Sequence, residues 1–178
     1  DVTKFGLIYA GAQKNVGPAG VTIVVIRDDL AKCSCREIPT ILRFSSHVEN
    51  GSLYNTPPVF SIYATMLTLR ELKKQGGVAA AQKRNEEKAK HIYDVLDSSK
   101  FYASPVEKES RSLMNIVFTL PSEEFTERFL AGAKERGMMG LKGHRSVGGI
   151  RASVYNAFPT EGAKALAQFM KDFERTAS

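Results

Sequence analysis

The chain is organised around the stretch Tyr9-Ala10-Gly11-Ala12-Gln13-Lys14-Asn15-Val16-Gly17-Pro18-Ala19-Gly20, in which one lysine lies among small residues. Apolar runs flank this stretch at residues 5–9 and 21–26. Both runs are short, rich in β-formers and bounded by Gly or Pro, a pattern typical of buried strands. We therefore expect Lys14 to lie between two buried strands and to be poorly solvated.

A poorly solvated lysine has a specific chemistry. Burial disfavours the charged ammonium, so the amine loses its proton more easily and becomes a nucleophile. Amines of this kind form Schiff bases with carbonyls, including the aldehyde of pyridoxal phosphate. Gly11, Gly17 and Gly20 would leave room for a flat ring beside it. An alternative stays open on these residues alone, namely a plain hairpin turn that carries a lysine at its tip.

Composition limits the class of protein. With 178 residues and 43% hydrophobic content, the chain is long enough for one domain, or one and a half, with a sizeable core. The net charge of +6 suits anionic ligands. No apolar run reaches the roughly 20 residues of a membrane span. Cys33 and Cys35 have no matching cluster of ligands, so we expect no metal site, and free thiols suit the cytoplasm.

The first residues indicate how the chain begins. The sequence opens at Asp1 without an initiator Met and enters an apolar run at once. We expect it to begin inside a larger protein.

The second motif is Tyr54-Asn55-Thr56-Pro57-Pro58-Val59-Phe60. Thr followed by Pro is typical of a helix start, because the hydroxyl caps a free N–H and proline fits the first turn. Apolar residues at helical spacing follow, and Gly76-Gly77 marks the end of this helix. Its N-terminus could bind a phosphate, and an ordinary capped helix is the alternative.

Further elements follow from periodicity. We expect a loop over 32–52, with His47 on the surface. An amphipathic helix is predicted over 82–98, with the charged side chains, Lys88 among them, facing outward. The pattern then predicts a strand over 113–120, a helix from Ser122 to near Gly137 and a closing helix from Thr160.

The third motif is Leu141-Lys142-Gly143-His144-Arg145-Ser146-Val147-Gly148-Gly149-Ile150-Arg151-Ala152-Ser153-Val154-Tyr155-Asn156. Alternation places Ile150, Ala152 and Val154 on one face of a strand and Arg151 on the other. An arginine fork on a rigid element can bind a carboxylate, and His144-Arg145 could bind a second anion. Surface arginines in ion pairs remain the alternative, and a nucleic-acid site would need more basic and aromatic residues.

Three motifs in this order resemble the phosphoserine aminotransferases, class-V pyridoxal-phosphate enzymes of fold type I. The resemblance implies an α/β fold in which residues 1–80 end the large cofactor-binding domain and residues 81–178 form a small C-terminal domain. It also implies amino transfer between glutamate and 3-phosphohydroxypyruvate, which gives O-phospho-L-serine and 2-oxoglutarate in serine biosynthesis. The alternatives are another fold type I aminotransferase, or a non-catalytic fragment that binds anions or forms a dimer.

The resemblance further implies roles for single residues. Lys14 would carry pyridoxal 5'-phosphate and shuttle protons, and Gln13 would help to hold the cofactor phosphate. The pair Asn55 and Thr56 would reach the cofactor of the neighbouring subunit, which implies a homodimer. Substrate would be bound by Arg151, at the α-carboxylate, and by His144 and Arg145, at the phosphate or distal carboxylate. The carboxylate and the stacking aromatic that such a cofactor also needs cannot be assigned in this sequence, so we expect the isolated chain to be inactive.

Overall fold

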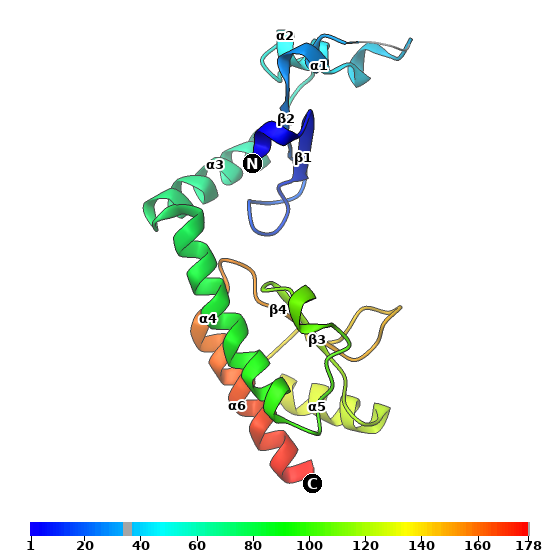
Figure 1. Ribbon diagram of the computed structural model, residues 1–178, viewed down its shortest axis with the longest axis vertical. Coiled ribbons are helices and arrows are strands. Elements are labelled where there is room, and N and C mark those ends of the chain that lie inside the picture. The colour runs from blue at the N-terminus through cyan, green and yellow to red at the C-terminus, as the bar shows by residue number, and fades with distance from the viewer. Residues whose placement is uncertain (34–36, 178) are drawn as a thin grey trace. The chain divides into compact units, whose positions relative to one another are not determined.

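The computed structural model describes residues 1–33 and 37–177 and divides the chain into two compact units, Asp1–Lys74 and Gln75–Ser178. We call them the N-terminal unit and the C-terminal unit. Each contains helices and one two-stranded antiparallel sheet (Figure 1). The fold is therefore mixed α/β, as the sequence predicts. In the described part of the chain, no helix combines the length and the apolar character required to cross a membrane.

The N-terminal unit is built on a β-hairpin. Its strands pair antiparallel, with Tyr9 opposite Val24. The elements of this unit, in chain order, are η1 (Val2–Lys4), β1 (Leu7–Gly11), β2 (Thr22–Ile26), α1 (Asp28–Ala31), η2 (Thr40–Leu42), α2 (Phe44–Glu49) and α3 (Val59–Lys74). The short helix α2 lies in the region expected to be a loop. Cys35 lies outside the described residues, and Cys33 is exposed.

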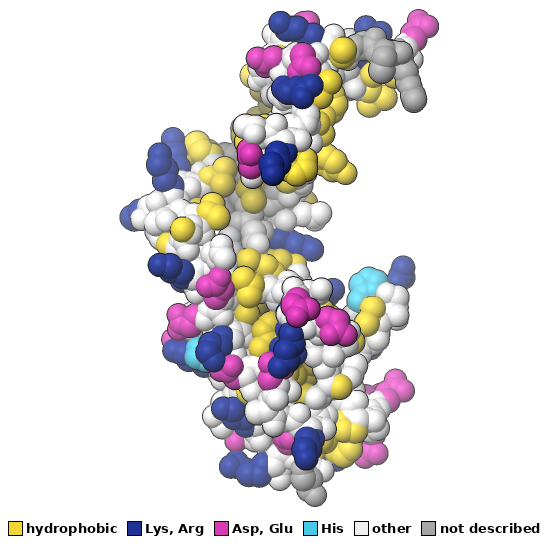
Figure 2. All heavy atoms as spheres, in the orientation of Figure 1, with side chains coloured by type: hydrophobic (Ala, Val, Ile, Leu, Met, Phe, Trp, Pro, Cys, Tyr) yellow, Lys and Arg dark blue, Asp and Glu magenta, His cyan; other side chains and the backbone are white. Residues whose placement is uncertain are grey.

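The two strands were expected to be buried, and this prediction is wrong for the chain as it stands. Tyr9 is 74% exposed and Val25 55% exposed. A two-stranded ribbon cannot enclose its own side chains, and it needs further strands or a second layer to do so. Hydrophobic side chains consequently reach the surface of this unit (Figure 2).

Helix α3 begins later than the Thr-Pro motif predicts. Its first residue is Val59, and Thr56 lies three residues ahead of it. A residue that precedes proline is confined to extended conformations, so Pro57, which precedes Pro58, cannot be helical. Thr56 is therefore not the N-cap of this helix. The predicted end is confirmed, because α3 stops at Lys74 and Gly76 has a positive φ of 94°.

The C-terminal unit has its own hydrophobic core. Helices α4 and α6 pack side by side along one face of the sheet formed by β3 and β4 (Figure 1). The elements of this unit are α4 (Gly77–Ser98), η3 (Lys108–Ser110), β3 (Asn115–Phe118), α5 (Glu123–Glu135), β4 (Ile150–Ser153) and α6 (Thr160–Ala177). Phe118, Phe129 and Phe169 meet inside as tilted and edge-to-face ring pairs.

Of the predictions about single side chains of this unit, the Ser122 cap and the alternation along β4 are confirmed, and the placement of Lys88 is wrong. The Ser122 hydroxyl caps α5 by accepting a hydrogen bond from the Phe125 N–H at 3.3 Å. Ile150 and Ala152 face the core, whereas Arg151 lies on the opposite face of β4. Lys88 was expected to face outward, but it is only 1% exposed. Its position on the helix decides this, because Lys88 falls one turn before Ile92 on the buried face of α4.

Candidate functional site

The Lys14 loop joins the two strands of the hairpin. Its backbone is closed by hydrogen bonds from the Lys14 N–H to the Gly17 carbonyl at 2.9 Å and from the Gly17 N–H to the Ala12 carbonyl at 2.8 Å. Lys14 has a φ of 90°, a left-handed conformation that is uncommon outside glycine. Strain of this kind is concentrated at functional sites, where the surrounding structure holds the residue in place.

This loop rests on helix α3. The Ser61 hydroxyl donates to the Ala19 carbonyl at 3.0 Å. Gly17 approaches so closely that a Cβ at this position would lie 2.5 Å from the Thr65 hydroxyl and 3.1 Å from the Thr65 Cα. Only glycine allows that approach without a shift of the loop. A regular helix thus supports the backbone that carries Lys14.

Lys14 itself is exposed, which corrects the prediction that it is poorly solvated. The expectation depended on buried strands, and the strands of this hairpin are exposed. An exposed primary amine on a loop that α3 supports can still attach covalently to the aldehyde of pyridoxal phosphate. Gln13, its neighbour, is also exposed. The residues of the loop therefore fit the aldehyde of the cofactor.

Asn55 and Thr56 lie in the segment ahead of α3. Both side chains are exposed, and the Asn55 amide donates to the Thr56 carbonyl at 3.1 Å. Exposed polar groups in this segment are accessible to a second molecule. The structure thus leaves both residues available for a contact outside the N-terminal unit.

The remaining predicted site residues lie in the C-terminal unit, around a loop that leads into β4. The segments on either side of this loop pair with each other, because the Gly143 N–H donates to the Gly149 carbonyl and the Arg151 N–H donates to the Leu141 carbonyl, each at 2.8 Å. His144 and Arg145 lie on the loop, and both are exposed. The pairing brings the His-Arg pair and Arg151 into one structural element.

His144 has a defined hydrogen-bonding state in this loop. The backbone N–H of Ser146 donates to His144 Nδ1 at 3.3 Å, and the Ser146 hydroxyl lies 2.7 Å from the same nitrogen. Because Nδ1 accepts, the proton of a neutral imidazole resides on Nε2. Nε2–H is then the group that His144 can offer to an anion.

Arg151 is held on the rigid part of this element. It pairs with Val117 of β3 across the sheet. Its side chain is partly buried, and the buried Nε has no hydrogen-bond partner among the described residues. An unpaired buried guanidinium nitrogen is costly, so such a group normally has a partner in the functional state. The arrangement suits an anion that accepts from the planar fork of Arg151.

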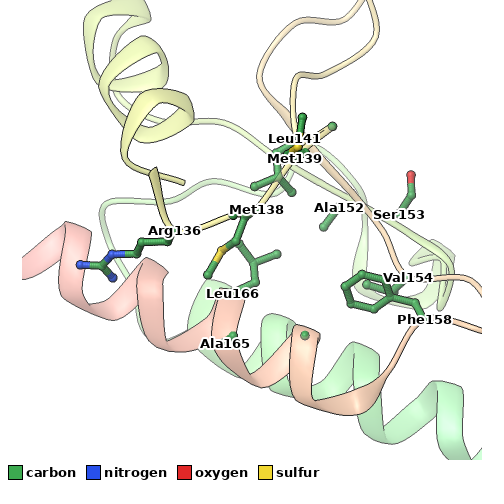
Figure 3. Close-up of a pocket in the computed structure, with 13 residues that line it drawn as sticks. Arg136, Met138, Met139, Leu141, Ala152, Ser153, Val154, Phe158, Ala165 and Leu166 are labelled. Atoms are coloured by element: carbon green, nitrogen blue, oxygen red, sulfur yellow. The ribbon is translucent and has the colours of Figure 1, made fainter. Parts of the chain in front are cut away.

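One pocket of the C-terminal unit lies apart from the predicted site residues. It has a volume of about 270 Å³, and its lining includes Met138, Leu141, Val154 and Leu166 (Figure 3). Arg151 is not among its lining residues, whereas the buried residues Ala152 and Val154 are. We assign no chemistry to this apolar pocket.

Sequence reasoning missed a polar network next to the predicted substrate site. Asn115 accepts hydrogen bonds from the hydroxyls of Ser153 at 3.0 Å and Tyr155 at 3.3 Å. Asn85 and Lys88, both buried on α4, contact the chain just after β4. Their helical spacing relative to Ile92 was the signal that could have identified them.

Comparison with known proteins identifies the family. The aminotransferase class-V family profile matches residues 1–166. A phosphoserine aminotransferase from Bacillus cereus is 58% identical over 174 residues, which cover 98% of this chain and 48% of that relative. The chain thus spans about half the length of the curated relatives that it matches.

Solved structures agree with this assignment. The phosphoserine aminotransferase from Bacillus circulans subsp. alkalophilus superposes with a TM-score of 0.96 at 50% identity, over 100% of this chain and 50% of that one. The pyridoxal-phosphate-bound phosphoserine aminotransferase from Trichomonas vaginalis gives a TM-score of 0.89 at 39% identity, over 96% and 49%. The chain therefore belongs to the class-V aminotransferase family.

Proposed function

We propose that this chain supplies the cofactor lysine and the substrate-binding arginine of a phosphoserine aminotransferase. The enzyme transfers an amino group between glutamate and 3-phosphohydroxypyruvate, with O-phospho-L-serine and 2-oxoglutarate as the other pair. The observation that carries the proposal is 58% identity to an enzyme of that name over 98% of the chain. Residues 1–80 then belong to the large cofactor-binding domain and residues 81–178 to the small domain.

Pyridoxal 5'-phosphate, when bound, supplies an electron sink that stabilises negative charge at the substrate α-carbon. Lys14 Nζ would hold the cofactor covalently, and as a free amine it would accept the α-proton and return it. The loop geometry supports this role, because α3 fixes the backbone of the loop. Gln13 helps to hold the cofactor phosphate from the adjacent position.

Asn55 and Thr56 complete the cofactor site of a neighbouring subunit. Their exposure supports a contact of this kind. The proposal therefore includes a homodimer in the cytoplasm, with each subunit donating this pair to the other site.

Substrate recognition belongs to the third motif. The Arg151 fork binds the α-carboxylate that every substrate of the reaction shares. His144 Nε2 and the Arg145 guanidinium bind the second anion, which is a phosphate in one substrate and a carboxylate in the other. A cluster of cationic and N–H donors tolerates both anions, whereas a neutral pocket shaped for one would reject the other.

The first test uses the full-length protein that carries these residues. We expect glutamate and 3-phosphohydroxypyruvate to be converted, and borohydride reduction followed by peptide mapping to show a cofactor-sized adduct on Lys14. Arg151→Leu should lower kcat/KM by about 100-fold, because a charge-assisted bidentate contact is lost. Arg128→Leu, on the exposed side of α5, is the control and should behave like the wild type. An adduct on another lysine would refute the assignment.

The 178-residue chain alone should have little or no activity. Its Lys14 is exposed, and no carboxylate or stacking aromatic for the cofactor ring is assigned in it. This favours the second candidate, a non-catalytic anion-binding fragment, for the isolated chain only. Brisk turnover by the purified chain would contradict this. A panel of amino acids tested beside phosphoserine would separate the proposed activity from that of other aminotransferases of the fold.

A further inference from the structure

We propose that Lys88 is a positioning residue that holds Arg151 in place for the substrate carboxylate. It acts through the backbone that leaves β4 and does not touch the substrate. The inference rests on the function proposed above, because it assigns Arg151 to the α-carboxylate.

The contacts of Lys88 all lie on one short segment. Its Nζ donates to the carbonyls of Tyr155 at 2.6 Å, Val154 at 3.1 Å and Phe158 at 3.2 Å. An ammonium has three N–H donors, so these three bonds satisfy it completely. Val154 is only three residues after Arg151. Lys88 therefore fixes the end of the strand that presents the arginine.

Burying an ammonium costs solvation free energy, even where it holds a turn. Lys88 is 1% exposed, and no carboxylate among the described residues pairs with it. Burial, with a further contribution from Arg84, lowers the pKa of Lys88. A buried charge persists only where its surroundings satisfy it. An apolar side chain of this size would instead leave three carbonyls without their donor.

Neighbouring contacts hold the same segment. One helical turn before Lys88, the Asn85 amide donates to Asn156 Oδ1 at 2.7 Å, and Asn85 is 3% exposed. From β3, Asn115 accepts hydrogen bonds from Ser153 and Tyr155. Residues 153–158 are thus tied to both α4 and β3.

β4 is only four residues long, so its pairing with β3 alone gives it limited rigidity. Fixing the C-terminal end of the strand limits its freedom to shift along or away from β3. A displacement of about 1 Å in a binding group can cost large factors in rate, so a fixed strand end matters for Arg151. Loss of Lys88 should therefore weaken carboxylate binding more than it affects the chemical step.

The experiment compares Lys88→Met with Lys90→Met in the full-length, cofactor-loaded protein. Lys90 lies on the same helix, is exposed and pairs with Asp94 at 2.6 Å. We expect Lys88→Met to raise KM for glutamate about tenfold while kcat changes less than about threefold. Glutarate, an unreactive dicarboxylate, should bind more weakly by a similar factor in calorimetry. Lys90→Met should leave all three quantities unchanged.

A double-mutant cycle separates positioning from general damage. In an Arg151→Lys background, Lys88→Met should have little additional effect on glutarate binding, because the fork that Lys88 positions is already gone. An equal effect in both backgrounds would overturn the proposal. So would a Lys88→Met protein that behaves like Lys90→Met.

Two further arms keep the test decisive. If Lys88→Met does not fold, Asn85→Ala is used instead, because it removes a single hydrogen bond to the same segment. It should raise KM for glutamate in the wild-type background and not in the Arg151→Lys background, and no change in either would overturn the proposal. If the wild type neither converts glutamate nor binds glutarate, the proposed function itself has failed.

Discussion

At the residue scale, the burial of Tyr102 makes the stability of the folded state depend on pH. Its ring lies in the core at 4% exposure, and its hydroxyl donates to the Met170 carbonyl at 2.8 Å. Burial, with a smaller contribution from Glu174, raises the pKa of Tyr102 well above its usual value. The folded state therefore retains the phenolic proton at a pH where the unfolded state, with a pKa of about 10, has lost it.

This sets the direction of the pH effect for Tyr102→Phe. Below about pH 10 the hydroxyl contributes about 1 kcal/mol through its hydrogen bond, so the variant should be less stable by that amount. Above about pH 10 the wild type should lose about 1.4 kcal/mol per pH unit relative to the variant. Urea unfolding of both proteins at about pH 8 and about pH 11 measures the difference. A gap that stays constant between the two pH values would contradict the assignment.

At the element scale, the loop that carries His144 and Arg145 depends on the glycine that ends it. Gly149 has a φ of 64°, and a Cβ there would lie 2.7 Å from the Phe118 carbonyl oxygen of β3. The neighbouring Gly148 has a similar φ of 74° but open space around it. The two positions thus share the backbone conformation and differ in the approach to β3.

Alanine at each position separates the cost of the left-handed backbone conformation from the cost of a clash with β3. Gly148→Ala should lower the free energy of unfolding by about 1–2 kcal/mol, the cost of a left-handed conformation for a residue with a Cβ. Gly149→Ala should cost at least about 1 kcal/mol more, because the clash with β3 is added. Chemical denaturation of the two variants tests this. Equal losses would show that β3 yields to the new methyl group without cost.

At the scale of the whole molecule, the two units differ in how many apolar side chains they bury. In the described part of the N-terminal unit, the buried residues are Ala12, Ala31, Ser46 and Thr65. The C-terminal unit instead has one continuous apolar core drawn from α4, α5, α6 and both strands. Local stability follows buried apolar contact, so the two units should open with different free energies.

Hydrogen exchange on the 178-residue chain measures this difference. We expect amides of α4, α6, β3 and β4 to be protected by orders of magnitude more than those of the hairpin. The reason is that exposed strands such as β2 have few apolar contacts to lose on opening. Equal protection in the hairpin would show that another surface covers it in solution.

The sequence alone predicted the elements that depend on local rules. The Ser122 cap, the alternation of Ile150, Arg151 and Ala152, and the end of α3 before Gly76 all come from hydrogen bonding and sterics within a few residues. The three motifs also predicted the family, because their order along the chain is a property of sequence.

Tertiary structure decided what local rules cannot reach. Lys14 is exposed and Lys88 is buried, the opposite of what each neighbourhood predicted. Whether a strand or a helix face is covered depends on which distant segments pack against it. Within the described chain most residues of the hairpin strands stay exposed, whereas the segment after β4 packs on α4 and offers Lys88 three carbonyls. Solvation of a charged side chain is therefore set by long-range packing, and residue type alone does not predict it.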